Sequence, residues 1–148
     1  MGTLNAAELR CFYADYVAAW NRRDLERYYS LYSEGVVFRD GTEILRGVGA
    51  LRQRYEAELE ALPDLTMECI RLLVDEGTQT LAAENLERGT HAGELTVGGE
   101  RFSPTGRQIE LRGGLFLVLD EEGLIAEMSE YIDPGQLLGA VTVDREGD

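Results

Sequence analysis

The chain has 148 residues, enough for one domain with a sizeable core, and its 44% hydrophobic and 28% charged residues are ordinary for a soluble globular protein. The formal net charge is −14, from 28 acidic and 14 basic residues. Because clustered basic side chains bind phosphate backbones, this balance argues against a nucleic acid partner. The apolar runs are too short to cross a membrane, and the first ten residues lack a signal-peptide pattern. We therefore expect one cytoplasmic domain over residues 1–148, with no membrane partner.

Few side chains suit metal or nucleophilic chemistry. Cys11 and Cys69 lie far apart without the spacing of metal ligands, and we expect both to be structural thiols. His91 is the only histidine, so neither a metal site nor a Ser-His-Asp arrangement is expected. No glycine-rich loop follows a strand at the spacing that cradles phosphate. We expect no metal ion and no cofactor.

The first half of the chain predicts helices. Apolar residues recur at helical spacing in three segments, residues 6–22, a shorter one after Asp24, and residues 48–62. Asn5 is placed to cap the first helix, and Pro63 stops the third. Residues 36–40 alternate as a short strand, and residues 41–47 are expected to form a loop.

The second half predicts long strands. They are expected at residues 65–74, 82–95, 107–120 and 124–133, with a Gly/Pro-rich link at 97–106 and a tight turn before the last strand. Helices first and strands afterwards indicate an α+β domain. We expect a cone-shaped fold, in which a curved antiparallel sheet packs against three N-terminal helices and encloses a pocket.

The phase of the last hairpin decides which side chains face that pocket. We place Phe116 on the inner face, which puts Gly114 and Arg112 there as well. On the last strand the inner set is Met128, Glu130 and Ile132. This predicts that Arg112 and Glu130 share an apolar face, whereas a one-residue slip would exchange Glu130 for Tyr131. The outer face would then carry Leu111, Leu115, Leu117 and Tyr131, which predicts a homodimer through the sheet.

Several other residues are candidates for the pocket. Asp40 ends a strand beside a loop, where catalytic groups often lie, although Asp-Gly is also a strong turn signal. Tyr16 is a candidate hydroxyl donor that could equally be core. Asn85 and Glu87 add polarity if they face inward, and the opposite phase would place Leu86 inside. The full set of expected lining residues is Trp20, Phe38, Tyr55, Asn85, Glu87, His91, Gly114, Phe116, Met128 and Ile132.

Nearly the whole chain resembles a SnoaL-like domain of the nuclear-transport-factor-2-like superfamily. The resemblance rests on the segments YVAAWNRRDLERYYSLYSEGVVFRD, EILRGVGALRQRY, GTHAGEL, PTGR and LRGGLFLVLDEEGLIAEMSEYID. It implies a structural hydrogen bond at the turn that holds His91. The superfamily hosts many activities, so it is a poor guide to substrate.

Three kinds of relative imply different catalytic groups. Similarity to ketosteroid isomerases implies Tyr16 as a donor and Asp40 as the proton carrier, but Gly114 stands where their second acid would be. Similarity to polyketide cyclases implies an acid/base carboxylate on the last strand, Glu130, with Asp133 as the competing assignment. Similarity to limonene-epoxide hydrolases implies Arg112 and Glu130 as two members of a three-residue set.

The resemblance implies a cofactor-independent enzyme. Its substrate would be a small or polycyclic, mostly apolar carbonyl compound, and its reaction proton abstraction followed by cyclisation or isomerisation. Glu130 or Asp40 would be the base, with Tyr16 and Arg112 stabilising the enolate. The alternatives are a non-catalytic ligand-binding domain of the same fold and an epoxide-opening enzyme.

Overall fold

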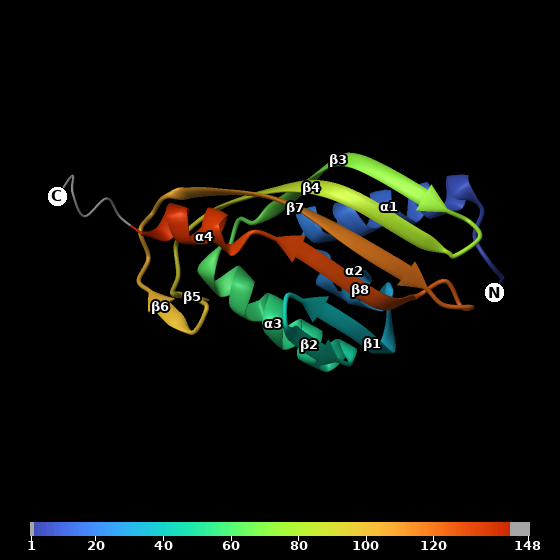
Figure 1. The fold of residues 1–148 in the computed structure, drawn as a ribbon, viewed down its shortest axis with the longest axis horizontal. Coiled ribbons are helices and arrows are strands. Elements are labelled where there is room, and N and C mark those ends of the chain that lie inside the picture. Colours follow the sequence, from blue (N-terminus) through green and yellow to red (C-terminus); the bar gives the residue numbers. More distant parts are fainter. Residues whose placement is uncertain (1, 143–148) are drawn as a thin grey trace.

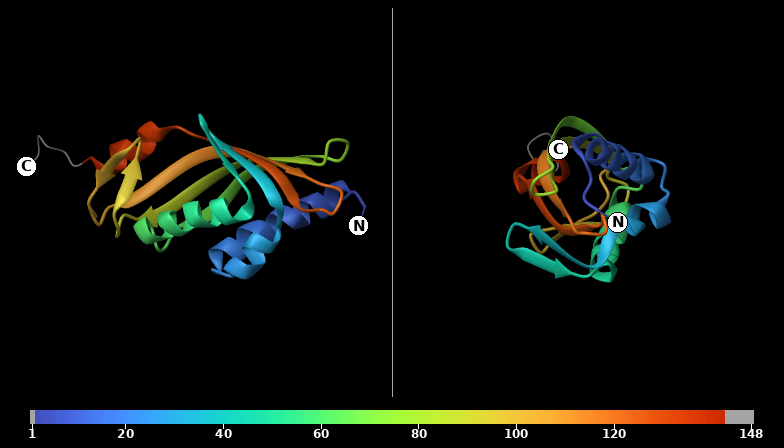
Figure 2. Two further views of the ribbon diagram at one scale, coloured as in Figure 1. Left: turned by 90° about the horizontal axis from the view of Figure 1, so that it is seen from below. Right: turned by 90° about the vertical axis from the view of Figure 1, so that its right-hand side faces the viewer.

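The computed structural model describes residues 2–142 (Figure 1). A curved six-stranded sheet has the order β2-β1-β8-β7-β4-β3, and a separate two-stranded hairpin pairs β5 with β6. The elements are α1 (Ala6–Asn21), α2 (Leu25–Ser30), β1 (Tyr32–Asp40), β2 (Glu43–Arg46), α3 (Val48–Ala61), β3 (Thr66–Asp75), β4 (Thr80–Thr90), β5 (Leu95–Val97), β6 (Glu100–Phe102), β7 (Gln108–Leu119), β8 (Ile125–Ile132) and α4 (Pro134–Val141). Helices α1, α2 and α3 lie under the concave side of the arched sheet (Figure 2). The α+β cone predicted from the sequence is confirmed.

Helix α1 shows how the sequence produces these elements. Asn5 and Glu8 form a reciprocal capping box at its start, which satisfies backbone N–H groups that have no partner within the helix. Its buried side chains include Leu9, Tyr13 and Tyr16, at the spacing of one helical face, and they pack toward the sheet. No helix in residues 2–142 is long and apolar enough to span a membrane.

Two segments expected to be loops are strands. Residues 43–46 form β2 because the Gly41-Thr42 turn, with Gly41 at a φ of 60°, folds the chain back against β1. Within the expected link, Gly98 and Gly99 both have positive φ, as a two-residue hairpin turn requires, and they join β5 to β6.

The two ends of the sheet also differ from the expectation. Strand β1 pairs with β8 in parallel, so the sheet is not wholly antiparallel. Helix α4 was not expected. Asp133 is its N-cap, and the Asp133 side chain accepts a hydrogen bond from the backbone N–H of Gly135. The helix packs along β7. Gln136 exchanges two hydrogen bonds with the backbone of Arg112, of 2.9 and 2.8 Å, at a point where β8 has already ended.

The predicted phase of β7 is wrong. Leu115 and Leu117 are buried on the concave side, whereas Phe116 is 47% exposed on the convex side. In the register of the hairpin, Leu115 lies opposite Glu130, and paired residues share a face of the sheet. The alternate residues Arg112, Gly114 and Phe116 therefore point away from the pocket. The physical reason is the number of apolar side chains. The alternating set Ile109, Leu111, Leu115, Leu117 and Leu119 buries far more apolar surface than Phe116 and Val118 on the other face would.

Candidate active site

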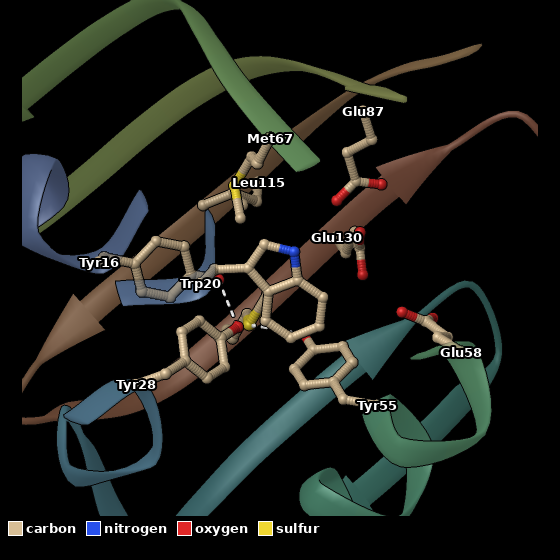
Figure 3. Close-up of a pocket in the computed structure, with 10 residues that line it drawn as sticks. Tyr16, Trp20, Tyr28, Tyr55, Glu58, Met67, Glu87, Leu115 and Glu130 are labelled. Atoms are coloured by element: carbon tan, nitrogen blue, oxygen red, sulfur yellow. Dashed lines mark hydrogen bonds between the residues drawn. The ribbon is translucent and has the colours of Figure 1, made fainter. Parts of the chain in front are cut away.

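A narrow pocket lies between the concave sheet face and the three N-terminal helices (Figure 3). Its free space is about 20 Å³. Its walls are mostly aromatic and apolar, but three of its side chains are glutamates. The lining residues are Tyr16, Trp20, Tyr28, Tyr55, Glu58, Met67, Glu87, Leu115, Met128 and Glu130.

The three glutamates come from three different elements. Glu58 is on α3, Glu87 on β4 and Glu130 on β8. In Figure 3 their carboxylates lie along one side of the pocket, with Glu130 between the other two, and the aromatic rings lie on the opposite side. No arginine or lysine is among the residues that line the pocket. All three residues are half-buried, and the Glu58 side chain is 32% exposed, so solvent screens these acid groups less than it would at the open surface.

This environment favours the protonated carboxyl groups. Burial raises the pKa of Glu130 well above its ordinary value, and repulsion from Glu87 and Glu58 adds to the effect. Burial raises the pKa of Glu87 to about 8, with a further contribution from Glu58. Burial also raises the pKa of Glu58 to about 7, although Arg54 opposes the shift. Near neutral pH the cluster therefore holds protons and negative charge together, as an acid and a base in one site would require.

Arg54 and Asp40 lie at the edge of this cluster. The Arg54 guanidinium donates to the Asp40 carboxylate over 2.8 Å, and also pairs with Glu43. Its Nε lies 3.6 Å from Glu58. Asp40 is 30% exposed and does not line the pocket. It is an ion-paired residue at the end of β1.

Three tyrosine hydroxyls meet beside the pocket. The Tyr16 hydroxyl lies 3.0 Å from that of Tyr28 and 3.2 Å from that of Tyr32, and the hydroxyls of Tyr28 and Tyr32 lie 2.7 Å apart. Burial raises the pKa of all three, so they remain neutral at physiological pH. The three hydroxyls are close enough for each to donate to one neighbour and accept from the other. Tyr16 thus lines the pocket as one member of a hydrogen-bonded hydroxyl cluster.

The structure brings together six of the residues predicted for the site. Glu130 and Tyr16 line the pocket, as do four of the predicted binding residues, namely Trp20, Tyr55, Glu87 and Met128. The inward phase of β4 and β8 is therefore confirmed. Phe38 is buried beside Tyr55, with ring centroids 6.2 Å apart, and Ile132 packs against Gly113.

Other predicted site residues lie elsewhere. Arg112 is on the convex face, where it forms an ion pair with Glu84, so the predicted pair with Glu130 does not exist. Gly114 and Phe116 share that face and cannot bind a ligand in the pocket. Asp133, the competing acid, caps α4.

His91 and Asn85 are buried away from the lining. The His91 ring lies 2.9 Å from the Thr105 hydroxyl and accepts from the Thr105 backbone, a structural bond of the expected kind. Asn85 lies on the same face of β4 as Glu87 and donates to the Tyr13 hydroxyl over 2.6 Å.

The predicted list of lining residues did not include Glu58, Tyr28, Met67 and Leu115. The signal for Glu58 was present, because it follows Tyr55 by three residues and so shares the inner face of α3. Leu115 was missed because of the wrong phase of β7. Tyr28 and Met67 lie at buried positions of α2 and β3, but only the fold brings them to the pocket.

Comparisons with known proteins identify the fold and the family. No curated protein sequence matched the chain significantly. Among solved structures, AclR, a putative hydroxylase from Streptomyces galilaeus, is similar with a TM-score of 0.80 and 26% identity, over 93% of this chain and 97% of that chain. A putative polyketide cyclase from Pseudomonas putida KT2440 has a TM-score of 0.75 and 20% identity, over 94% and 99%. SalBIII, an epoxide hydrolase/cyclase-like enzyme of pyran ring formation in salinomycin, has a TM-score of 0.72 and 16% identity, over 87% and 93%.

The last two likenesses lie at identities that establish the fold alone. A sequence model of the SnoaL-like domain matches residues 13–128. That span includes every residue that lines the pocket except Glu130, which lies in the last part of β8. The chain belongs to the family of SnoaL-like domains.

Proposed function

We propose that this protein is a cofactor-independent enzyme that moves a proton on an apolar carbonyl compound, as a polyketide cyclase or isomerase does. The observation that carries the proposal is the meeting of Glu58, Glu87 and Glu130 in one aromatic pocket. Isolated carboxyl groups are rarely placed in such surroundings, because burial opposes their ionisation. Strongly perturbed acids in a pocket are typical of functional sites.

The three acids divide naturally into donor and base. Glu130 has a pKa raised well above its ordinary value, so it stays protonated and can donate to a developing enolate oxygen together with Tyr16. Glu58, with a pKa of about 7, is partly ionised near neutral pH and can take the α-proton. Glu87 lies beside Glu130 and can share the proton that the cluster gains. The enolate would then attack within the same molecule or be reprotonated at another carbon.

The test requires no knowledge of the natural substrate. Exchange of α-hydrogens for deuterium in a panel of apolar ketones, followed by NMR in D₂O, measures proton abstraction directly. We expect Glu130→Gln and Glu58→Gln each to slow exchange by about 10²–10⁴-fold, the usual contribution of a positioned acid or base. Glu127→Gln is the matched control, since Glu127 is an exposed residue on β8 that pairs with Arg39.

Two outcomes would oppose the proposal. Exchange at the wild-type rate in both pocket variants would remove these carboxyl groups from the reaction. A wild-type protein that binds apolar ketones without exchanging their hydrogens would instead favour the non-catalytic ligand-binding domain.

A second candidate is the opening of an epoxide by an internal hydroxyl or by water. It is favoured by the same cluster, because epoxide opening needs a protonated acid at the oxygen and a base at the nucleophile at the same time. SalBIII, of the same fold, is named epoxide hydrolase/cyclase-like. Incubation of model epoxides and hydroxy-epoxides with wild type and Glu130→Gln, analysed by mass spectrometry, separates this reaction from enolisation.

A further inference from the structure

We propose that Arg54 is a positioning residue that makes Glu58 the base among the three pocket glutamates. Asp40 and Glu43 hold the Arg54 guanidinium at the distance from Glu58 that this role requires. The inference rests on the proposed function, because it explains how three like acids in one pocket receive different roles. It is carried by the ion pairs at the rim of the pocket and by their lengths.

The three pocket glutamates differ in their contact with positive charge. The Nε of Arg54 lies 3.6 Å from Glu58, which follows it by four residues on α3. Within residues 2–142 no arginine forms an ion pair with Glu87 or Glu130, and the sequence contains no lysine. An arginine stays charged at physiological pH, so it favours the ionised form of a neighbouring carboxyl group. Glu58 is therefore the pocket glutamate whose surroundings favour a negative charge.

The Arg54 guanidinium is fixed by its other two nitrogens. Its Nη2 donates to the Asp40 carboxylate over 2.8 Å, and its Nη1 donates to Glu43. Its central carbon lies 5.8 Å from the centre of the Phe38 ring. These partners belong to β1 and β2, which pair with each other, so the guanidinium is held between this strand pair and α3. Contact with several carboxylates fixes the orientation of the group better than one ion pair would.

The lengths of the ion pairs determine what Glu58 can do. A separation of 3.6 Å is too long for a hydrogen bond, whereas the contact of 2.8 Å with Asp40 is a short one. Arg54 therefore stabilises the charge on Glu58 without a hydrogen bond from its Nε. A carboxylate bound directly by a guanidinium would be a weaker base, because taking up a proton would weaken that bond. Glu58 is thus favoured in its charged form and remains able to accept a proton from a ligand.

Asp40 also acts on the acid of the site. It pairs with Glu130 in the parallel register of β1 and β8, so the two side chains share a face of the sheet. Burial, Glu87 and Glu58 raise the pKa of Glu130, and the negative charge of Asp40 adds to their effect. One carboxylate therefore holds the cation near the base and helps to keep a proton on the acid.

The test follows the Glu58 carboxyl group by NMR on protein labelled with ¹³C at the glutamate side chains. Its resonance is identified by its loss in Glu58→Gln, and in the wild type it should titrate with a pKa of about 7. In Arg54→Met this pKa should rise by about 1 pH unit or more, since an opposite charge within about 4–6 Å lowers a carboxyl pKa by about 1–3. In Arg54→Lys the pKa should not rise, because the lysine keeps the positive charge.

No neighbour can replace the charge of Arg54 when it is removed. The titratable groups around Glu58 and Arg54 are Tyr29 from α2, Asp40 from β1, Glu43 from β2, Tyr55 from α3, Glu87 from β4 and Glu130 from β8. Each of them is either neutral or negative. The change in Arg54→Met therefore reports the effect of this one cation on Glu58.

Two further variants separate the role of Arg54 from a general effect of charge. Asp40→Asn removes the closely bound carboxylate and lets the guanidinium approach Glu58, so the Glu58 pKa should fall below that of the wild type. Arg52→Met is the matched control. It removes one positive charge from an exposed position of the same helix, where Arg52 lies over the Tyr29 ring at 4.4 Å, and should leave the titration of Glu58 unchanged. Circular dichroism and thermal unfolding establish that each variant is folded.

Deuterium exchange in ketones supplies a second readout. The rate should rise with pH as Glu58 ionises, so this rise should move to higher pH in Arg54→Met and to lower pH in Asp40→Asn. At pH 7, a pKa higher by about 1 reduces the ionised fraction of Glu58 about fivefold, and exchange should slow by about that factor. A purely structural loss would lower the rate without moving its pH dependence.

Glu58 that titrates in Arg54→Met as it does in the wild type would overturn the inference, as would an equal change in Arg52→Met. A Glu58 pKa that rises in Asp40→Asn would overturn the role given to Asp40. Failure of the proposed function looks different. Wild-type protein that exchanges no hydrogens, while Glu58 responds to Arg54 as expected, would remove the proposed activity and leave Arg54 as the residue that keeps Glu58 ionised. Exchange that needs Glu58 but keeps its pH dependence in Arg54→Met would leave the activity and remove the inference.

Discussion

The pocket acids should make the protein less stable as the pH rises, and Glu87 allows the effect to be calculated. In the folded protein its pKa is about 8, whereas in the unfolded chain a glutamate has a pKa of about 4.3. Between these values the folded state holds a proton that the unfolded state has lost. Unfolding therefore releases a proton, and the free energy of unfolding falls as the pH increases. The loss ends once Glu87 is ionised in both states, above its folded pKa.

When the folded state holds one more proton than the unfolded state, the free energy of unfolding falls by about 1.36 kcal/mol for each pH unit. From pH 6 to the folded pKa of about 8, Glu87 should cost the wild type about 3 kcal/mol of stability. The glutamine of Glu87→Gln is uncharged at every pH, so the variant does not lose this part of its unfolding free energy. Relative to wild type, the variant should therefore gain about 3 kcal/mol between pH 6 and 9.

Urea unfolding at pH 6, 7, 8 and 9, followed by Trp20 fluorescence, measures the difference. Glu84→Gln, with its exposed position on the same strand, should follow the wild-type curve at every pH. A Glu87→Gln variant whose stability falls with pH as steeply as that of wild type would refute the reasoning. It would mean that Glu87 is ionised in the folded protein at pH 6.

Three further predictions follow from the hairpin of β7 and β8. Gly113→Ala should destabilise the protein by about 1–3 kcal/mol in urea unfolding, since a Cβ would lie 2.5 Å from Ile132 Cγ1. Gly114→Ala, where the nearest atom is 3.6 Å away, is its control, and equal losses would contradict the argument. Arg112→Met should leave deuterium exchange unchanged, because Arg112 is on the convex face, and a large loss of exchange would be inconsistent with that position. If the protein is a homodimer through its sheet, Phe116→Glu should yield a monomer by analytical ultracentrifugation, and an unaltered dimer would exclude this face.

The prediction of a homodimer now depends on different residues from those expected. Leu111, Leu115 and Leu117, which suggested an apolar outer face, are buried inside. The convex face instead exposes Phe116 and Tyr131, whose rings pack edge to face with centroids 6.1 Å apart. The homodimer remains a prediction and now depends on a smaller apolar surface.

Local signals were sufficient for the helices and for the order of the main strands. Asn5 caps α1 as expected because capping depends on neighbouring residues alone. The turn at Gly41 was recognised but not its consequence, since pairing of β2 with β1 requires only four residues that lack a strong strand pattern. The parallel pairing of β1 with β8 joins residues about ninety positions apart, and no local pattern encodes it.

The candidate site was predicted only where the strand phase was right. Glu87 and Glu130 were expected to face inward, and they do so. The expected partner Arg112 was misplaced, because one aromatic residue was given more weight than the alternating leucines around it. Glu58 was overlooked, because a charged residue next to an apolar helix face normally points to solvent. The clustering of the three acids is a property of the assembled fold.

The most direct test of the account is the titration of the glutamate carboxyl groups by NMR on protein labelled with ¹³C at the glutamate side chains. The Glu130 resonance is identified by its loss in Glu130→Gln. We predict that it titrates well above the ordinary glutamate value of about 4.3, because burial and the neighbouring Glu87 and Glu58 raise its pKa. Titration of Glu58, Glu87 and Glu130 all near the ordinary value of about 4.3 would show that the pocket does not hold protons, and would contradict the account.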